Sequence, residues 1–284
     1  MSEGSKRIRM DTNFQDLPVE MMLRIFFYHS FIELKTFSEV CKHWRDVIED
    51  GFMLSDKLIL KCKCDQIVKD SDLQGLKDSS RKYGKLLVTC ACQTENAVRV
   101  LTTLGIKEIR TKFMHTKDVY ELIKYAMSDL VSLDSKLVPE DPEDDGDLNA
   151  NELFPNLKSI KLTISQKCHL DFLKKLFVLN SKTIQELDLS FGDHSTENET
   201  LDYDWSFLGE ATNLKIIKFD VNMECTLNTE NILEQIKSVE ELQLSGFKIP
   251  EKILLNMNDF FPNLTKLRLS SIQNCHQLKI DLRR

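Results

Sequence analysis

The sequence predicts an α/β protein: a three-helix module at the N-terminus, followed by a solenoid with a parallel sheet on its concave side and helices outside. Two observations carry this prediction. A dense apolar stretch near the N-terminus shows three short helical patterns, and an L-x-x-L-x-L pattern then recurs through the rest of the chain. A strand followed by a helix stacks in this way because no single repeat can bury its own apolar face. We therefore divide the chain into a flexible tail at 1–13, a helical module at 14–54 and about nine repeats at 55–284.

The first helix of the module is expected to open at Pro18, which gives up no hydrogen bond in a first turn, with Glu20 beside the positive end of the helix dipole. The apolar positions of the three helices are Met21, Met22, Ile25 and Phe26; Leu34, Phe37, Val40 and Cys41; and Cys41, Trp44, Val47 and Ile48. Three short helices cannot bury so many apolar side chains among themselves. The module is therefore expected to meet either the first repeat or a partner.

At these residues the chain resembles an F-box. The family pattern is Leu-Pro followed by an acid, an Ile-Phe pair, a Leu before Val-Cys, and then a basic residue and Trp-Arg. The residues that match it are Leu17, Pro18, Glu20, Ile25, Phe26, Leu34, Val40, Cys41, Lys42, Trp44 and Arg45. Phe14 stands where an aromatic residue often precedes Leu-Pro. One departure is His29, where the family usually has an aliphatic residue.

The resemblance implies a binding role. F-box modules dock on the Skp-family adaptor, which hangs from the cullin scaffold of an SCF ubiquitin ligase. The adaptor-binding surface carried over to this sequence is Phe14, Leu17, Pro18, Ile25, Phe26, Leu34, Val40, Cys41 and Trp44. Aromatic and aliphatic anchors of this kind suit an interface between helix faces. Pro18 and Ile25 are expected to face the partner most directly. The alternative for Leu34, Val40 and Trp44 is a place in the module's own core.

The repeats are defined by their spacing. Copies of the pattern begin at residues 55, 83, 106, 130, 157, 184, 214, 239 and 264, which is one copy every 23 to 30 residues. This period resembles that of leucine-rich repeats, although the asparagine usual after each strand is mostly missing. The resemblance implies one strand per repeat in a parallel sheet. The inward residues expected from the five clearest strands are Ile160 with Leu162, Leu187 with Leu189, Ile217 with Phe219, Leu242 with Leu244 and Leu267 with Leu269.

Helices are predicted between strands, where apolar residues recur at spacings of three and four. These patterns are Ala97/Leu101/Leu104, Val119/Leu122/Ile123/Ala126, Leu170/Leu173/Leu176/Phe177, Ile232/Leu233/Ile236 and Ile253/Leu254/Met257. The repeat that begins at residue 130 is expected to lack a regular helix. Its helix position is taken by residues 139–152, which carry seven acidic residues and no basic one and predict an acidic loop.

The net charge of −7 equals the charge of that acidic loop, so the rest of the chain is neutral overall. A neutral body lacks the basic stripe that nucleic-acid binding requires. No run of about 18 apolar residues predicts a membrane helix, and the N-terminal residues lack the apolar core of a secretory signal. We therefore expect a protein of the cytoplasm, the nucleus or both, whose eight cysteines are reduced thiols.

Neither a metal site nor a catalytic site is predicted. Cys62 and Cys64, like Cys90 and Cys92, are separated by one residue, a spacing that does not fit the usual zinc motifs. These cysteines are better explained as small core residues. Six histidines are scattered along the chain, and no phosphate-binding glycine loop, zinc-protease motif or hydrolase motif occurs. We expect no cofactor and no enzyme activity.

The outward side chains of the sheet are the candidate surface for a protein target. One column of them reads Lys161, Asp188, Lys218, Gln243 and Arg268. Its mixed signs suit a polar protein better than a polyanion. An exposed sheet face is polar in any case, so single residues in it need not touch a partner. Tyr203 is a further candidate because it lies in a long loop, whereas Trp205 in the same loop is better explained by packing.

Together the two resemblances imply a substrate-recognition subunit of an SCF-type cullin–RING ubiquitin ligase. The F-box would dock on the Skp-family adaptor, and the repeats would present a protein target. Two alternatives remain open. One is a protein that binds the adaptor without presenting a target, and the other is a repeat scaffold whose F-box-like stretch only caps the array. Adaptor binding and turnover of a target separate the three.

Overall fold

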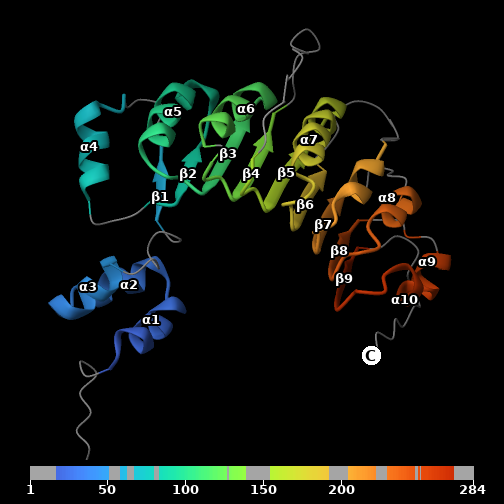
Figure 1. Ribbon diagram of the computed structural model, residues 1–284, viewed down its shortest axis with the longest axis horizontal. Coiled ribbons are helices and arrows are strands. Elements are labelled where there is room, and N and C mark those ends of the chain that lie inside the picture. Colours follow the sequence, from blue (N-terminus) through green and yellow to red (C-terminus); the bar gives the residue numbers. More distant parts are fainter. Residues whose placement is uncertain are drawn as a thin grey trace, which may run out of the picture.

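The computed structural model describes residues 17–50, 58–62, 67–79, 83–126, 128–138, 154–191, 204–221, 229–246, 249 and 251–271. These residues form two parts with separate cores: a helical module at the N-terminus, and a nine-stranded parallel sheet with helices packed against it (Figure 1). The predictions for Phe14, Tyr203 and the acidic segment 139–152 fall outside the described residues.

Local hydrogen bonds set the starts of the helices in the module. Its described helices are α1 (Val19–Phe27), α2 (Phe31–Ser38) and α3 (Lys42–Asp50). Pro18 is the N-cap of α1, one position before the helix begins. Ser30 caps α2: its Oγ accepts a hydrogen bond from the Glu33 N–H at 3.4 Å, and the Glu33 carboxylate accepts one from the Ser30 N–H at 2.7 Å. Before α3, the sulfur of Cys41 accepts a hydrogen bond from the Trp44 N–H at 3.4 Å.

The module has a small core of its own. Its buried side chains are Met22, Phe26, Leu34, Val47 and Ile48. The ring of Phe26 contacts those of Phe37 and Trp44, with centroid distances of 5.8 and 5.5 Å. His29 joins this aromatic cluster, since its ring meets that of Phe37 edge-on at 4.9 Å. A polar ring therefore fits at this position because it packs by its edge.

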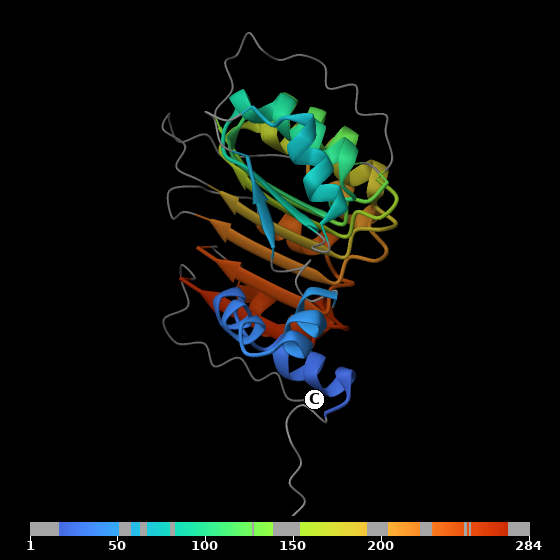
Figure 2. The same ribbon diagram turned by 90° about the vertical axis from the view of Figure 1, so that its left-hand side faces the viewer.

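The strands of the sheet follow the order of the chain. They are β1 (Ile59–Lys61), β2 (Lys85–Val88), β3 (Glu108–Met114), β4 (Ser132–Leu137), β5 (Ser159–Ile164), β6 (Glu186–Phe191), β7 (Ile216–Val221), β8 (Glu241–Ser245) and β9 (Lys266–Ser270). Each strand from β2 to β8 pairs with the strand before it and the strand after it, and β1 and β9 are the edges of the described sheet. In Figure 2 the yellow to red strands run side by side and point the same way. The parallel sheet that the sequence period predicts is thus present.

Side chains alternate between the two faces of the sheet because a strand has a period of two. In β5, Ile160, Leu162 and Ile164 are fully buried, whereas the residues between them are at least partly exposed. β6 and β7 show the same alternation. The predicted inward residues of β9, Leu267 and Leu269, are only half-buried, because β9 is the last strand of the described sheet.

The helices lie on one face of the sheet, on the outer side of its curve (Figure 1). They are α4 (Asp70–Asp78), α5 (Thr94–Thr103), α6 (Thr116–Tyr125), α7 (Lys167–Asn180), α8 (Thr229–Gln235), α9 (Glu251–Leu255) and α10 (Met257–Phe260), with the 3-10 helices η2 (Ala91–Gln93) and η4 (Ser206–Glu210). The predicted patterns fall on α5 to α10. The sequence patterns miss α4, which buries Leu73 alone and so has little apolar periodicity. Within the described part of the chain, none of these helices is long and apolar enough to cross a membrane.

Asparagines that precede β5 and β7 tie consecutive repeats together. The side-chain amide of Asn156 donates a hydrogen bond to the Ser128 carbonyl at 2.6 Å, and that of Asn213 donates to the Lys182 carbonyl at 2.5 Å. Each bond reaches back to the turn at the same place in the previous repeat. The asparagine that opens these copies therefore satisfies a carbonyl that no strand pairs.

One cysteine pair departs from the expectation of reduced thiols. The structure joins Cys90 to Cys92 by a disulfide, with their Cα atoms 5.5 Å apart. The two residues flank Ala91, where the chain turns from β2 into η2, and this turn brings both side chains to the same side. Cys41 and Cys62 are free thiols, and burial raises the pKa of Cys62 to about 11. The reduced state predicted for all eight cysteines is therefore wrong for this pair.

Two inward positions carry hydroxyl groups in place of aliphatic side chains. Thr111 in β3 and Ser135 in β4 are register partners and are 2 % and 1 % exposed. Their side-chain oxygens lie 2.6 Å apart. A buried hydroxyl without a partner costs about 1–3 kcal/mol, so each residue supplies the hydrogen bond that the other needs.

Replacing Thr111 by valine should therefore lower the free energy of unfolding by about 1–2 kcal/mol, because the Ser135 hydroxyl stays buried without its partner. The double change Thr111→Val/Ser135→Ala removes both hydroxyls and should recover most of that loss. Urea unfolding of the wild type, both single variants and the double variant measures the coupling. Losses that simply add in the double variant would contradict the pairing.

Candidate binding surfaces

The outward face of the sheet carries a column of polar residues at one register position. From β3 to β9 its members are Arg110, Asp134, Lys161, Asp188, Lys218, Gln243 and Arg268. The sign of the charge alternates from β3 to β7. Adjacent strands lie about 4.8 Å apart, so opposite charges attract across each step, whereas like charges would repel. Gln243 is the first member that breaks this alternation.

Glu108 is the centre of an ion-pair cluster at the N-terminal end of this face. Its carboxylate lies 2.6 Å from both the Lys85 Nζ and the Arg110 Nε. Burial alone would raise the pKa of Glu108, but the hydrogen bonds from Lys85 and Arg110 outweigh it and hold the pKa below its ordinary value. On β4, burial raises the pKa of Asp134, and the attraction to Lys161 and Arg110 does not compensate. Glu108 is thus the carboxylate whose charge stabilises this end of the sheet.

The predicted target-binding residues of the column all lie on the outward face, but they differ in whether they form ion pairs within the protein. They are Lys161, Asp188, Lys218, Gln243 and Arg268. The first two form an ion pair with each other at 3.1 Å, and Lys218 pairs with Glu186 of β6. Gln243 and Arg268 form no side-chain hydrogen bond or ion pair with any residue that the structure describes. These two are therefore the members of the column most available to a partner.

Trp205 lies in the core, as its packing interpretation predicts. It is fully buried, and its ring stacks on Phe207 at 5.9 Å and contacts Phe219 at 6.0 Å. Tyr203, the neighbouring candidate for target binding, lies outside the described residues. The described end of this loop therefore closes the core between β6 and β7 and leaves no aromatic ring for recognition.

Phe113 is an exposed aromatic residue that the sequence patterns do not reveal. It has a φ of 57°, which is rare for a bulky residue, at an irregularity in the pairing of β3 with β4. Both Lys112 and Phe113 are exposed there, and the Lys136 Nζ lies 5.1 Å from the centre of the Phe113 ring. The repeat pattern of a single strand gives no signal for this bulge, because the bulge concerns the pairing of two strands.

The helical module exposes a dense set of large apolar side chains. Those between 43 % and 85 % exposed are Val19, Met21, Phe27, Tyr28, Ile32 and Val40. They come from α1, α2 and the turn before α3, whose inner faces already fill the small core. Exposed apolar surface of this density is typical of a site that meets a partner. Most of these residues are missing from the predicted surface, although α1 signals its own members, since seven of its nine residues are apolar.

Comparison with known protein families identifies this module. Residues 14–59 match the model of the F-box-like family. Residues 14–59 are an F-box-like domain. The match spans α1 to α3 and ends at the first residue of β1, so the rest of the sheet lies outside it. The comparison of the chain with curated proteins gives no match.

The residues predicted to bind the adaptor take different places in the F-box-like domain. Pro18 and Val40 are exposed to solvent. Phe26 and Leu34 are each 1 % exposed, so in this arrangement they form the core and do not face a partner. The half-buried members are Leu17, Ile25, Cys41 and Trp44. Phe14 lies outside the described residues. Contact with the adaptor itself stays a prediction.

At the N-terminal end of the sheet, Glu108→Gln should lower the free energy of unfolding at pH 7 by about 1–2 kcal/mol, since the carboxylate accepts two charge-assisted hydrogen bonds. The pKa of Glu108 is lower in the folded protein than in the unfolded chain. Its contribution is therefore full above about pH 4.3 and is lost as the pH falls through the folded value. The difference between wild type and variant should shrink accordingly in acid.

Urea unfolding of both proteins at a series of pH values between about 7 and 3 measures this difference. Glu121→Gln is the matched control, because Glu121 is exposed on α6. That variant should change stability little at any pH. A Glu108→Gln effect that stays constant down to about pH 3 would contradict the assignment.

Proposed function

We propose that the protein is a substrate-recognition subunit of an SCF-type cullin–RING ubiquitin ligase. The observation that carries the proposal is the F-box-like domain at 14–59, because F-box domains typically bind Skp-family adaptors. In this role the domain docks on the adaptor, and the sheet presents a protein target to the charged ubiquitin carrier. The protein then acts by position alone: it raises the local concentration of the target and performs no chemistry itself.

The sheet and its helices are proposed to be a leucine-rich-repeat solenoid. Three observations support this. Successive strands begin 23 to 30 residues apart, all described strands are parallel and in chain order, and their inward positions are mainly Leu and Ile. In such an array the outward strand face is the concave surface. The proposed target therefore contacts that face, which also carries the column from Arg110 to Arg268.

The adaptor surface is proposed to consist of the exposed apolar residues of the F-box-like domain. Pro18 and Val40 come from the predicted surface, and Met21, Phe27 and Ile32 extend it. Burying apolar area contributes about 25 cal/mol per Å², so a patch of this kind is a sufficient source of affinity. The proposed place of action is the cytoplasm, the nucleus or both.

A scaffold without receptor activity is the second candidate. The observation that favours it is the internal pairing on the outward face, where most charged residues already bind each other. Charged side chains that already form ion pairs with each other are less available to bind a target. The two candidates differ in one outcome: a receptor shortens the lifetime of the protein that it binds, and a scaffold does not.

The adaptor-binding role predicts that Pro18→Ala/Val40→Ala abolishes stoichiometric co-purification with the Skp-family adaptor. Each truncation at the centre of an interface costs more than about 1 kcal/mol, so the pair should weaken binding at least roughly tenfold. Val178→Ala/Leu255→Ala is the matched control, because it truncates two exposed apolar residues on the helices of the sheet. That variant should bind like the wild type.

Circular dichroism of both double variants checks that the fold is kept. A wild-type chain that is folded and does not bind the adaptor would contradict the proposed function. So would equal loss of binding in both double variants.

A further inference from the structure

The alternation of charge along the outward column stops at Gln243. From Arg110 on β3 to Asp188 on β6, each member faces a residue of opposite sign on the next strand, and Lys218 on β7 is the last member of this series. On β8 an acid would continue the series, but the residue is glutamine, and Arg268 follows on β9. The column therefore ends with a cation on either side of an amide.

Two lysines near this end are already neutralised. Lys218 is bonded to Glu186, and the Lys266 Nζ lies 2.6 Å from the Glu241 carboxylate. The hydrogen bond from Lys266 holds the pKa of Glu241 below its ordinary value, so this carboxylate is charged at neutral pH. Arg268 has no ion pair with any of the described residues. Glu241 also feels the charge of Arg268, but its carboxylate forms its ion pair with Lys266, so Arg268 keeps its hydrogen-bond donors for another acceptor.

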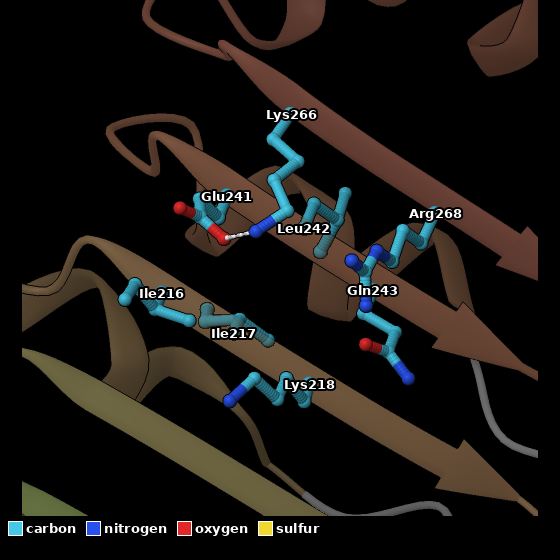
Figure 3. Close-up of a pocket in the computed structure, with 8 residues that line it drawn as sticks. All are labelled: Ile216, Ile217, Lys218, Glu241, Leu242, Gln243, Lys266 and Arg268. Atoms are coloured by element: carbon cyan, nitrogen blue, oxygen red, sulfur yellow. Dashed lines mark hydrogen bonds and ion pairs between the residues drawn. The ribbon is translucent and has the colours of Figure 1, made fainter. Parts of the chain in front are cut away.

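The unpaired groups line a pocket on the outward face of β7, β8 and β9 (Figure 3). The Arg268 guanidinium extends over β8 to the side chain of Gln243, while the Lys266–Glu241 pair stands at the other side of Leu242. Ile216, a half-buried residue on β7, adds an apolar patch. The pocket therefore combines free hydrogen-bond donors with an aliphatic surface.

We propose that this pocket binds the carboxylate of an aspartate or glutamate in an extended segment of a partner protein, with an aliphatic side chain of the same segment on Ile216. This rests on the proposed function, since it names the class of target that the outward face takes. The guanidinium of Arg268 donates two parallel hydrogen bonds to such a carboxylate, and the amide of Gln243 donates another. The partner thus supplies the acid that the column lacks on β8.

The charge of the pocket favours a carboxylate over a phosphate. Of the three cations that line the pocket, Lys218 and Lys266 have ion pairs and Arg268 has none, which matches one carboxylate. A phosphate group carries about two negative charges at neutral pH and would stand close to Glu241. The lining of the pocket comes from three neighbouring strands, and two steps between strands span roughly 10 Å, the length of about three extended residues, so a short extended segment that lies across the strands reaches both ends. The acid and the aliphatic residue are therefore expected about two or three positions apart.

The test is a selection of random dodecapeptides displayed on phage, with the full-length chain as bait. Arg268→Gln is selected in parallel, and Lys252→Gln is the matched control, because Lys252 is an exposed cation on α9. Wild type and Lys252→Gln should enrich peptides with an acid about two or three positions from an aliphatic residue. Arg268→Gln should not enrich them.

A selected peptide then serves as the probe for affinity. Arg268→Gln, or replacement of the peptide's own acid by its amide, should each weaken binding about tenfold, and the two changes together should cost little more than one of them. Gln243→Glu places the missing acid in the protein itself and should also prevent binding, whereas Gln243→Met, of similar size and without charge, should weaken it far less.

Several results would overturn the proposal. They are a selection without acid enrichment, equal binding to wild type and Arg268→Gln, and tighter binding when phosphoserine replaces the acid. Binders that emerge only after the acids of 139–152 are changed to amides would assign the pocket to that segment. A dimer lost on Arg268→Gln, measured by size-exclusion chromatography, would assign it to a second copy. The selection needs no adaptor, so a failure of this proposal can be distinguished from a failure of the adaptor-binding role.

Discussion

The register of the parallel sheet is the constraint on which the rest of the structure depends. Side chains alternate along each strand, so a shift of one residue would turn Ile160, Leu162 and Ile164 toward solvent and carry the charged column into the core. Burying unpaired charges costs several kcal/mol for each ion, which is comparable to the whole stability of a domain. The apolar core and the charged face therefore fix the same register. Each further strand must align with its neighbour in that register to place its own apolar side chains in the core.

The F-box-like domain meets a different constraint, because three short helices enclose very little. Its core contains five buried side chains, whereas several equally large ones are exposed to solvent. A domain this small is only marginally stable by itself. Any partner that covers Phe27, Tyr28 and Ile32 would bind the folded form alone and so stabilise it. Exposed apolar residues thus weaken the isolated domain and strengthen its complex.

Periodic features of the molecule can be predicted from the sequence, and features set by contacts between elements cannot. The pairs from Ile160/Leu162 to Leu242/Leu244 are visible because burial on one face imposes a period of two. The Thr111–Ser135 bond is not, since a hydroxyl in one strand says nothing about its neighbour in the next. The bulge at Phe113 cannot be predicted either, because it depends on how β3 pairs with β4.

The F-box-like domain was predictable as a motif, but its surface was only partly so. A motif records which residue types occur at which spacing, and both core and surface positions satisfy it. Phe26 and Leu34 fit the pattern because they hold the helices together, whereas Tyr28 and Ile32 are exposed without being part of it.

In the outward column of the sheet, the informative residue is the one that does not follow the pattern. There a departure from the pattern, the amide at Gln243 between Lys218 and Arg268, marks the position most open to a partner. A partner without an acid at that place would have to desolvate the Arg268 guanidinium without forming a new ion pair, which costs free energy. The guanidinium therefore contributes to specificity in two ways: it binds partners with the acid and disfavours partners without it.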